Sequence, residues 1–324
     1  MLVVVCPGQG AQSPGMLTPW LEVPGVAPAL HRAAEVTGVD LVRHGTTSDA
    51  DTIRDTAVAQ PLLVASALAS LRAVLGASEP TAGWTEVVAG RLGGVGGHSV
   101  GELAALAISG VVSDDEALRL VAVRGAAMAR AAAAGPTTGM SAVLGGDPQE
   151  VLTAIARHGL VAANVNGGGQ VVAAGPLDRL AALAAEPPAK ARIIALQVAG
   201  AFHTDVMAPA VADLQAAADQ VVPADPTTPL LSNADGELVS SGAEALARVV
   251  AQVARPVRWD LCQQTMAEQG VTGLLEVAPG GVLTGLARRT LPGVETVALK
   301  SPADLDAARD LVLRHTAPTA KEQQ

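Results

Sequence analysis

The sequence predicts a mixed α/β fold, because short β-rich segments alternate with longer helical patterns. Residues 2–6 (LVVVC) form an apolar run that ends at Pro7-Gly8, as expected of a buried parallel strand. Helical patterns follow at 26–36 and 58–75. Of the 324 residues, 49% are hydrophobic and 16% are charged. This composition can fill a large buried core and is unlike that of a disordered chain.

The alternation continues up to residue 134. Residues 86–92 (EVVAGRL) are expected to form a second strand that enters a cluster of glycines. The pattern GELAALAISG that follows the cluster predicts a helix that stops at Gly110. Asp114 and Asp115 then open a further helix that runs through Ala134.

Between residues 135 and 198 the order of elements changes to β-α-β-β-α-β, which is typical of a small ferredoxin-like unit. The expected segments are strand 140–146, helix 148–158, strand 161–166, strand 170–175, helix 176–186 and strand 191–198. The junctions near Ala134 and Ala199 are rich in Gly, Ala and Pro, so we expect this unit to be an insertion into a larger one.

The chain then returns to the larger unit. The expected segments are helix 205–220, strand 229–232, helix 243–254 and strand 274–279. Residues 317–324 are expected to form a flexible tail.

The charge balance and the rare residue types exclude several classes of function. The chain has 31 acidic and 21 basic side chains and a net charge of −10, so we expect no nucleic-acid partner. Three Trp, one Phe and no Tyr leave no platform for stacking bases. Cys6 and Cys262 form no metal or disulfide pattern, which suits a reducing cytoplasm. The sequence suggests neither a signal peptide nor a membrane span.

The strongest motif is Gly97-His98-Ser99-Val100-Gly101, which fits G-x-S-x-G between an expected strand and an expected helix. Small residues two before and two after Ser99 permit a sharp turn that exposes a nucleophilic hydroxyl. The helix from Val100 points its free N–H groups at this turn, where they can hold an oxyanion. An accidental match is the alternative interpretation, since the chain has 34 glycines.

A nucleophilic serine needs a base, and six histidines are available. His203 lies at a strand-to-helix junction on the C-terminal side of Ser99, although a loop histidine is commonly a surface residue. His98 is the next candidate, but its side chain should leave the turn in another direction. The loop at 7–12 lacks the third glycine of a dinucleotide loop, so we expect it to present N–H groups near Ser99.

Five motifs occur in the order found in the malonyl-CoA:acyl carrier protein transacylases. They are PGQGAQ at 7–12, GHSVGE at 97–102, VAVRGAAM at 121–128, GAFH at 200–203 and EVAPGGVLTGL at 276–286. The sequence resembles this family over roughly residues 2–300. The resemblance implies an α/β-hydrolase-like large subdomain (residues 1–134 and 199–316) with an inserted ferredoxin-like small subdomain (residues 135–198).

The resemblance also implies catalytic roles for individual residues. Ser99 would be the acylated nucleophile and His203 its base. The backbone N–H groups of Gln9 and Val100 would form the oxyanion hole. Gln252 matches the position whose backbone carbonyl orients the histidine, in place of the Asp of a triad.

Specificity is implied for two further residues. Arg124 would hold the malonyl carboxylate in a bidentate pair, whereas a solvated helix arginine is the alternative. Phe202 resembles the malonyl-selecting form of its motif and would leave little room for a methyl branch. The chain departs from the family pattern at Gly281, where a lysine is common, at Thr204, where serine is usual, and at Cys6, where an aromatic is common.

The implied reaction is ping-pong transfer of malonyl from malonyl-CoA, through a seryl ester, to the phosphopantetheine thiol of acyl carrier protein for fatty acid biosynthesis. It implies no metal and no bound cofactor, and we expect a cytoplasmic monomer. Because the carrier protein is acidic, docking needs a local basic patch. Lys190, Arg192 and Arg288-Arg289 are candidates, with ordinary solvated charges as the alternative.

Three other functions were weighed. A stand-alone polyketide-synthase acyltransferase would use identical chemistry. A serine esterase has no use for Arg124, because a neutral ester cannot pair with a buried guanidinium. A non-catalytic scaffold that binds carrier protein would not need Ser99, His203 and Arg124 together.

Overall fold

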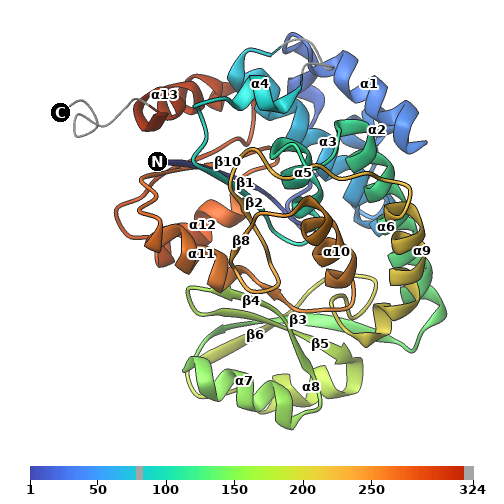
Figure 1. Ribbon diagram of the computed structural model, residues 1–324. Helices are drawn as coiled ribbons and strands as arrows, with labels where there is room; N and C mark the ends of the chain where they lie inside the picture. Colours follow the sequence, from blue (N-terminus) through green and yellow to red (C-terminus); the bar gives the residue numbers. More distant parts are fainter. Residues whose placement is uncertain (78–82, 317–324) are drawn as a thin grey trace.

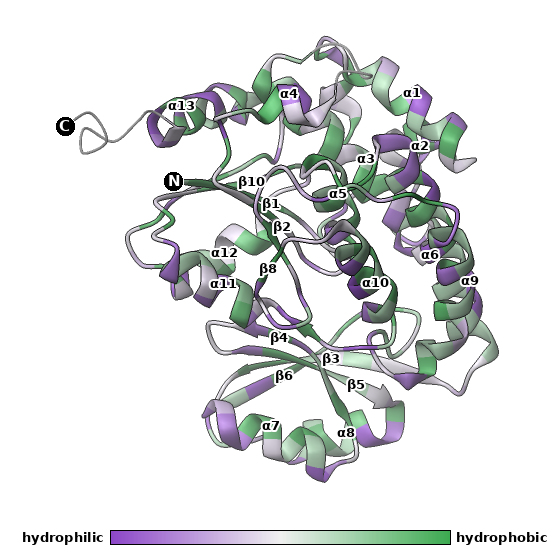
Figure 2. Cartoon of the chain, viewed as in Figure 1, coloured by the Kyte–Doolittle hydropathy of each residue, from purple (hydrophilic) through white to green (hydrophobic). Residues whose placement is uncertain are grey.

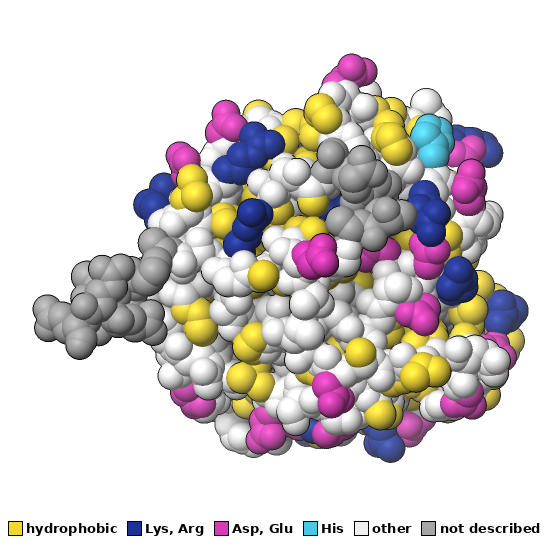
Figure 3. Space-filling view, turned by 45° about the horizontal axis from the view of Figure 1, so that its top comes forward, with side chains coloured by type: hydrophobic (Ala, Val, Ile, Leu, Met, Phe, Trp, Pro, Cys, Tyr) yellow, Lys and Arg dark blue, Asp and Glu magenta, His cyan; other side chains and the backbone are white. Residues whose placement is uncertain are grey.

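The computed structural model describes residues 1–77 and 83–316, and its fold is mixed α/β as predicted. The expected tail at 317–324 lies outside the described residues. Two β-sheets organise the chain, one in the upper and one in the lower part of Figure 1. Charged side chains of both signs are interspersed over the face shown in Figure 3.

The first sheet has six strands in the order β11-β10-β1-β2-β7-β8. Their bounds are β1 Leu2–Cys6, β2 Gly94–Gly97, β7 Leu230–Leu231, β8 Leu238–Val239, β10 Gly273–Glu276 and β11 Glu295–Ala298. All neighbours are parallel except β7 and β8, which are antiparallel. Cys6 lies opposite Gly97, so the loops that leave β1 and β2 emerge side by side at the carboxyl edge, where ligands bind in such sheets.

The second sheet has the order β6-β3-β5-β4-β9. Its strands are β3 Thr138–Gly145, β4 Val161–Gly167, β5 Gln170–Pro176, β6 Ala191–Ala195 and β9 Val257–Arg258. Helices α7 (Pro148–Arg157) and α8 (Leu177–Ala185) cover its outer face in Figure 1. The fifth strand, β9, was not expected: it comes from a distant part of the chain and pairs in parallel with β4, with Val257 opposite Asn164.

Helices pack around the first sheet. They are α1 Val26–Thr37, α2 Leu41–Thr46, α3 Thr56–Leu75, α4 Trp84–Val88, α5 Gly101–Ile108, α6 Asp114–Ala134, α9 Ala208–Ala218, α10 Gly242–Gln252, α11 Trp259–Glu268, α12 Val282–Thr290 and α13 Leu305–Thr316. Short 3₁₀ turns lie at Thr18–Glu22, Thr52–Arg54, Asp205–Met207 and Pro302–Asp304. Hydrophobic and hydrophilic residues alternate along α1 and α13 in Figure 2, because each helix buries one face and exposes the other.

Helix α3 differs from these because it is buried along almost its whole length. Among the described residues it is the one helix long and apolar enough to cross a membrane, with a mean hydropathy of 1.6. However, 89% of that apolar window is buried within the protein, and the core helix of a globular protein meets the same criteria. Its length and composition are therefore weak evidence of a membrane span.

The strand expected at 86–92 is wrong. Residues Trp84–Val88 form helix α4, with Trp84 and Val88 buried one turn apart, and the strand lies later at Gly94–Gly97. Three of the four residues of that strand are glycines, which have low β-propensity, so the pattern favoured the preceding Val-rich segment. The strands expected at 191–198 and 274–279 are shorter, ending at Ala195 and Glu276.

Candidate active site

Ser99 occupies a sharp turn between strand β2 and helix α5. Its φ is 54°, a left-handed conformation that residues with a Cβ rarely adopt. The two flanking glycines are required by close packing. A Cβ on Gly97 would lie 2.0 Å from the backbone of Gly101, and a Cβ on Gly101 would lie 2.2 Å from the Cys6 carbonyl oxygen. The structure therefore gives the G-x-S-x-G motif the strand–turn–helix geometry of a nucleophile elbow.

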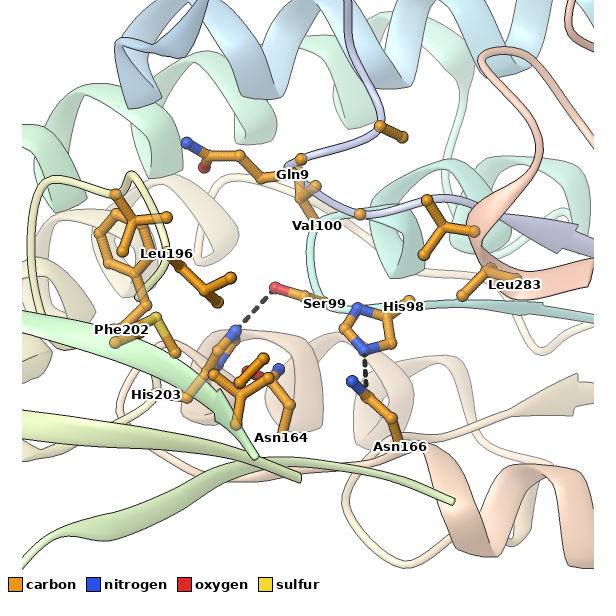
Figure 4. Close-up of a pocket in the computed structure, with 18 of the residues that line it drawn as sticks. Gln9, His98, Ser99, Val100, Asn164, Asn166, Leu196, Phe202, His203 and Leu283 are labelled. Atoms are coloured by element: carbon orange, nitrogen blue, oxygen red, sulfur yellow. Dashed lines mark hydrogen bonds between the residues drawn. The ribbon is translucent and has the colours of Figure 1, made fainter. Parts of the chain in front are cut away.

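His203 lies within hydrogen-bonding distance of Ser99, with Nε2 2.7 Å from Oγ (Figure 4). Its Nδ1 is 2.8 Å from the backbone carbonyl oxygen of Gln252. Nδ1–H donates to this carbonyl, which leaves Nε2 free to accept the Ser99 hydroxyl proton. Burial, and secondarily the charge of Arg124, lower the pKa of His203 to about 3, so its imidazole is neutral near pH 7.

Two backbone N–H groups flank Ser99. Neither the Gln9 nor the Val100 N–H donates a hydrogen bond to another described residue, and both residues line the cavity around Ser99. The side chain of Gln9 turns away from Ser99 in Figure 4, and its Nε2 donates to the Arg54 carbonyl and to Thr56 Oγ1. These bonds hold the loop after β1 beside the elbow. Val100 is the N-cap of α5, so its N–H lies at the positive end of that helix.

Arg124, on helix α6, is 1% exposed and contacts Ser99. Its Nη2 lies 3.4 Å from Ser99 Oγ and donates to Gln252 Oε1 at 3.1 Å, while Nη1 donates to Gln60 Oε1 at 2.7 Å. The guanidinium forms no salt bridge within the described chain, although the Glu102 carboxylate acts on it electrostatically, and its Nε has no hydrogen-bond partner there. Burial lowers the pKa of Arg124 to about 10. The solvated-arginine alternative is thus wrong.

Sequence reasoning missed three buried polar residues around this centre: Gln60, Glu102 and Asn233. The Glu102 carboxylate accepts from the Asn233 N–H at 2.6 Å and from the Gln252 side-chain amide. Burial raises the pKa of Glu102 to about 8. Glu102 stood in the GHSVGE motif, and its polar type within an otherwise apolar helix was the one available signal. Gln60, in the apolar helix α3, gave the same kind of signal, whereas Asn233 had none.

A cavity of about 210 Å³ opens above Ser99, between the two sheets. The second sheet contributes Met140, Ala142, Asn164 and Val172 to its lining, and Phe202 and Leu196 close one side. His98 faces it as well, but its Nε2 lies 2.8 Å from Asn166 Oδ1, on the other side of the elbow from His203. His98 therefore has no contact with the Ser99 hydroxyl among the bonds of the described chain.

The basic residues Arg288 and Arg289 are exposed at the end of helix α12. Residues of the same helix line the cavity, beginning with Val282, which is 51% exposed. Arg289 Nε donates to the Gly168 carbonyl at 3.1 Å, which ties the helix to the turn between β4 and β5.

Lys190 and Arg192 lie at the start of strand β6 and are also exposed. Ala191, between them, pairs with Gly145, whose N–H donates to the Gly169 carbonyl at 2.8 Å. Arg289 and the segment Lys190–Arg192, far apart in sequence, therefore border the same glycine turn, Gly167–Gly169, whereas Arg288 Nε donates to Thr296 Oγ1 at 3.3 Å. We call these four side chains the basic rim.

No group of three or more His, Cys, Asp or Glu side chains within the described ranges is arranged to hold a metal ion. The two cysteines are buried and unpaired, and burial raises the pKa of both thiols.

Comparison with known proteins agrees with this geometry. Residues 3–308 match the family model described as an acyl transferase domain. The chain is 50% identical over 311 residues to the malonyl CoA-acyl carrier protein transacylase of Mycobacterium tuberculosis, covering 96% of this chain and all of that protein. It is 32% identical to the protein of the same name from Escherichia coli, with 95% and 98% of the two chains covered.

Solved structures give the same result. The crystal structure of the Mycobacterium tuberculosis protein superimposes with a TM-score of 0.88 at 49% identity, covering 95% of this chain and 99% of that one. A malonyl-transacylase that was solved in complex with a type II polyketide-synthase acyl-carrier protein superimposes with a TM-score of 0.84 at 30% identity, with 95% and 99% covered. The chain is an enzyme of the acyl transferase domain family and belongs, within it, to the malonyl CoA-acyl carrier protein transacylases.

Proposed function

We propose that this enzyme transfers the malonyl group of malonyl-CoA to the phosphopantetheine thiol of acyl carrier protein, for fatty acid biosynthesis. The observation that carries the proposal is that two groups, an imidazole and a guanidinium, both contact the Ser99 hydroxyl oxygen. Ser99 Oγ lies 2.7 Å from a neutral imidazole nitrogen and 3.4 Å from a buried guanidinium, beside the cavity between the two sheets. The first contact supports acyl transfer, and the second supports an acyl group that carries its own carboxylate.

In the first half-reaction, Ser99 Oγ attacks the thioester carbonyl and its proton moves to His203 Nε2. The N–H groups of Gln9 and Val100 stabilise the resulting oxyanion. As the intermediate collapses, the carbon–sulfur bond breaks and His203 returns the proton to the CoA sulfur, which leaves a malonyl ester on Ser99. Gln252 holds the ring through its backbone carbonyl.

In the second half-reaction, the carrier-protein thiol gives its proton to His203 and its sulfur attacks the ester carbonyl. Collapse returns the proton to Ser99 Oγ and releases malonyl thioester. Throughout, Arg124 would hold the malonyl carboxylate by displacing one of its glutamine partners, Gln60 or Gln252. We further propose that Phe202, which is 6% exposed and lines the cavity, limits branching at the acyl α-carbon.

We interpret the two sheets as an α/β-hydrolase-like large subdomain (1–134 and 199–316) with a ferredoxin-like small subdomain (135–198) inserted. The site would then lie between the subdomains, since both contribute to the cavity lining. We expect the enzyme to act as a cytoplasmic monomer, without metal or bound cofactor and without a nucleic-acid or membrane partner.

The basic rim is our candidate for the carrier-protein contact. Lys190, Arg192, Arg288 and Arg289 are all exposed. Arg289 contacts the Gly167–Gly169 turn, and Gln170, directly after that turn, lines the cavity. On a chain with a net charge of −10, such a local cluster can attract an acidic partner. A related malonyl-transacylase was solved in complex with a type II polyketide-synthase acyl-carrier protein. Malonyl transfer to a polyketide carrier protein is therefore the second candidate function.

The test is intact-protein mass spectrometry after mixing with malonyl-CoA. Wild type should gain one malonyl group on Ser99 and lose it to added carrier protein. The variant Ser99→Ala should gain none, with an unchanged circular dichroism spectrum. His203→Ala should form the adduct about 10² to 10⁴ times more slowly. Hydrolysis of the adduct without transfer to carrier protein would instead indicate a serine esterase.

A further inference from the structure

Asn233 lies in the loop after strand β7 and is completely buried, at 0% exposed. Its side-chain amide contacts the backbone on both sides of the nucleophile elbow. Oδ1 accepts from the Ser99 N–H at 2.8 Å, and Nδ2 donates to the Gly97 carbonyl at 2.8 Å. Because these partners are backbone groups of fixed polarity, only one orientation of the amide satisfies both.

The same two bonds are those that a neighbouring parallel strand would make. In a parallel sheet, one residue bonds to the carbonyl and the N–H of two residues that are two apart on the adjacent strand. Strand β7 runs parallel to β2, with Leu230 opposite Val95, but has only two residues. The Asn233 amide therefore continues the sheet pairing at the point where the β2 backbone turns into the elbow.

Asn233 also connects the elbow with the residue that orients the base. Its Oδ1 accepts a second hydrogen bond, from Gln252 Nε2 at 3.1 Å. The backbone carbonyl of the same glutamine holds His203 Nδ1. The main-chain N–H of Asn233 is fixed in turn by Glu102 Oε1, so the loop itself is anchored.

We propose that Asn233 is a positioning residue for acyl transfer, whose side-chain amide sets the distance between Ser99 and His203 by holding the elbow and Gln252 together. The elbow needs such a restraint, because the left-handed backbone of Ser99 costs free energy that other contacts must offset. Asn233 does not line the cavity, so its effect on the reaction passes through other residues. The inference rests on the proposed function, since it assigns Ser99 and His203 as nucleophile and base.

The probe is a fluorophosphonate, which forms a bond from Ser99 Oγ to phosphorus, expels fluoride and passes the serine proton to His203. It contains neither CoA nor a carboxylate, so its labelling rate reports the alignment of Ser99 with His203 and the oxyanion-hole N–H groups, independently of CoA or carboxylate binding. Asn233→Ala should lower this rate about 10²-fold, the usual effect of a displacement near 1 Å. Malonyl adduct formation should fall by a similar factor.

Two further variants separate positioning from stability. Asn233→Asp keeps the shape and the Oδ1 acceptor but places an oxygen against the Gly97 carbonyl, so it should also label at least ten times more slowly. Ser70→Ala is the matched control, because the buried Ser70 Oγ likewise holds a loop N–H, that of Ala278, far from the elbow along the chain. It should lower the melting temperature and leave the labelling rate unchanged.

The outcomes are distinct. Labelling within twofold of wild type in either folded Asn233 variant would overturn the inference. So would failure of both variants to fold, because a positioning role requires that the fold form without these bonds. If wild type itself takes neither phosphonate nor malonyl group, the proposed function fails instead.

Discussion

At the scale of single residues, the guanidinium of Arg124 is the feature that separates this site from that of a plain hydrolase. It is buried among neutral amide oxygens and lacks a carboxylate partner among the described residues. Such a charge is costly to bury, and a substrate carboxylate at this point would offset part of that cost. The guanidinium is held in place by the side-chain oxygens of two glutamines, Gln60 and Gln252.

Arg124→Ala should therefore reduce malonyl transfer strongly and raise acetyl transfer relative to it. Losing one side of a buried charge pair costs roughly 2–5 kcal/mol. Arg124→Lys should rescue only part of this loss, because an ammonium cannot form the planar two-bond contact. The measurement is kcat/KM for malonyl-CoA and acetyl-CoA in each variant.

Arg130→Ala provides the control on the same helix. Arg130 is exposed and pairs with Asp213 at the surface, so its removal should leave the malonyl-to-acetyl ratio unchanged. An unchanged ratio in all the Arg124 variants would assign that arginine a structural role.

At the scale of elements, the β2–α5 elbow shows how a catalytic turn depends on its glycines. Gly101 opens α5 directly against the end of β1, where an added Cβ would lie 2.2 Å from a backbone oxygen. Gly101→Ala should destabilise the protein by about 1–3 kcal/mol, the usual range for overpacking, and should slow acyl transfer. Gly285→Ala, in helix α12 with open space around the new Cβ, should stabilise it by about 0.5–1 kcal/mol.

Urea unfolding of both variants measures these changes. Equal shifts for the two substitutions would show that backbone propensity, and not packing at the elbow, determines the effect.

The same element marks the limit of what the sequence predicts. The motif around Ser99 predicted the turn, and the order of hydrophobic segments predicted the longer helices and most strands of the two sheets. Helices α2, α4, α11, α12 and α13 and strands β8, β9 and β11 were not expected. The strand that leads into the turn was misplaced, because glycine carries no strand preference and β2 is held by neighbours distant in sequence. The roles of Asn233 and Gln60 were not predicted for a similar reason. The role of a buried amide depends on its hydrogen-bond partners, and the partners of these two residues are distant in sequence.

At the scale of the whole molecule, two buried groups of the active site tie folding stability to pH in opposite directions. His203 has a pKa of about 3 in the folded chain, against 6.5 for an ordinary histidine, mainly because it is buried. The unfolded chain therefore binds an extra proton between these values, and His203 lowers stability as the pH falls from about 6.5 towards 3. Glu102 has a pKa raised by burial from 4.5 to about 8. The folded chain binds that proton first, so Glu102 raises stability as the pH falls from about 8 to 4.5.

Comparing wild type with a variant that lacks one of these groups isolates the contribution of that group to stability. The free energy of unfolding of wild type, relative to His203→Gln, should fall as the pH is lowered from 6.5 to 4.5, with a slope of at most about 1.4 kcal/mol per pH unit. Relative to Glu102→Gln, the wild-type value should rise as the pH is lowered from 8 to 5. Urea unfolding at half-unit steps of pH measures both differences, and His98, whose pKa burial also lowers, cancels because it is present in all three chains. Parallel curves for wild type and His203→Gln would mean that His203 is protonated in the folded enzyme at mildly acidic pH, and it could then not serve as the base there.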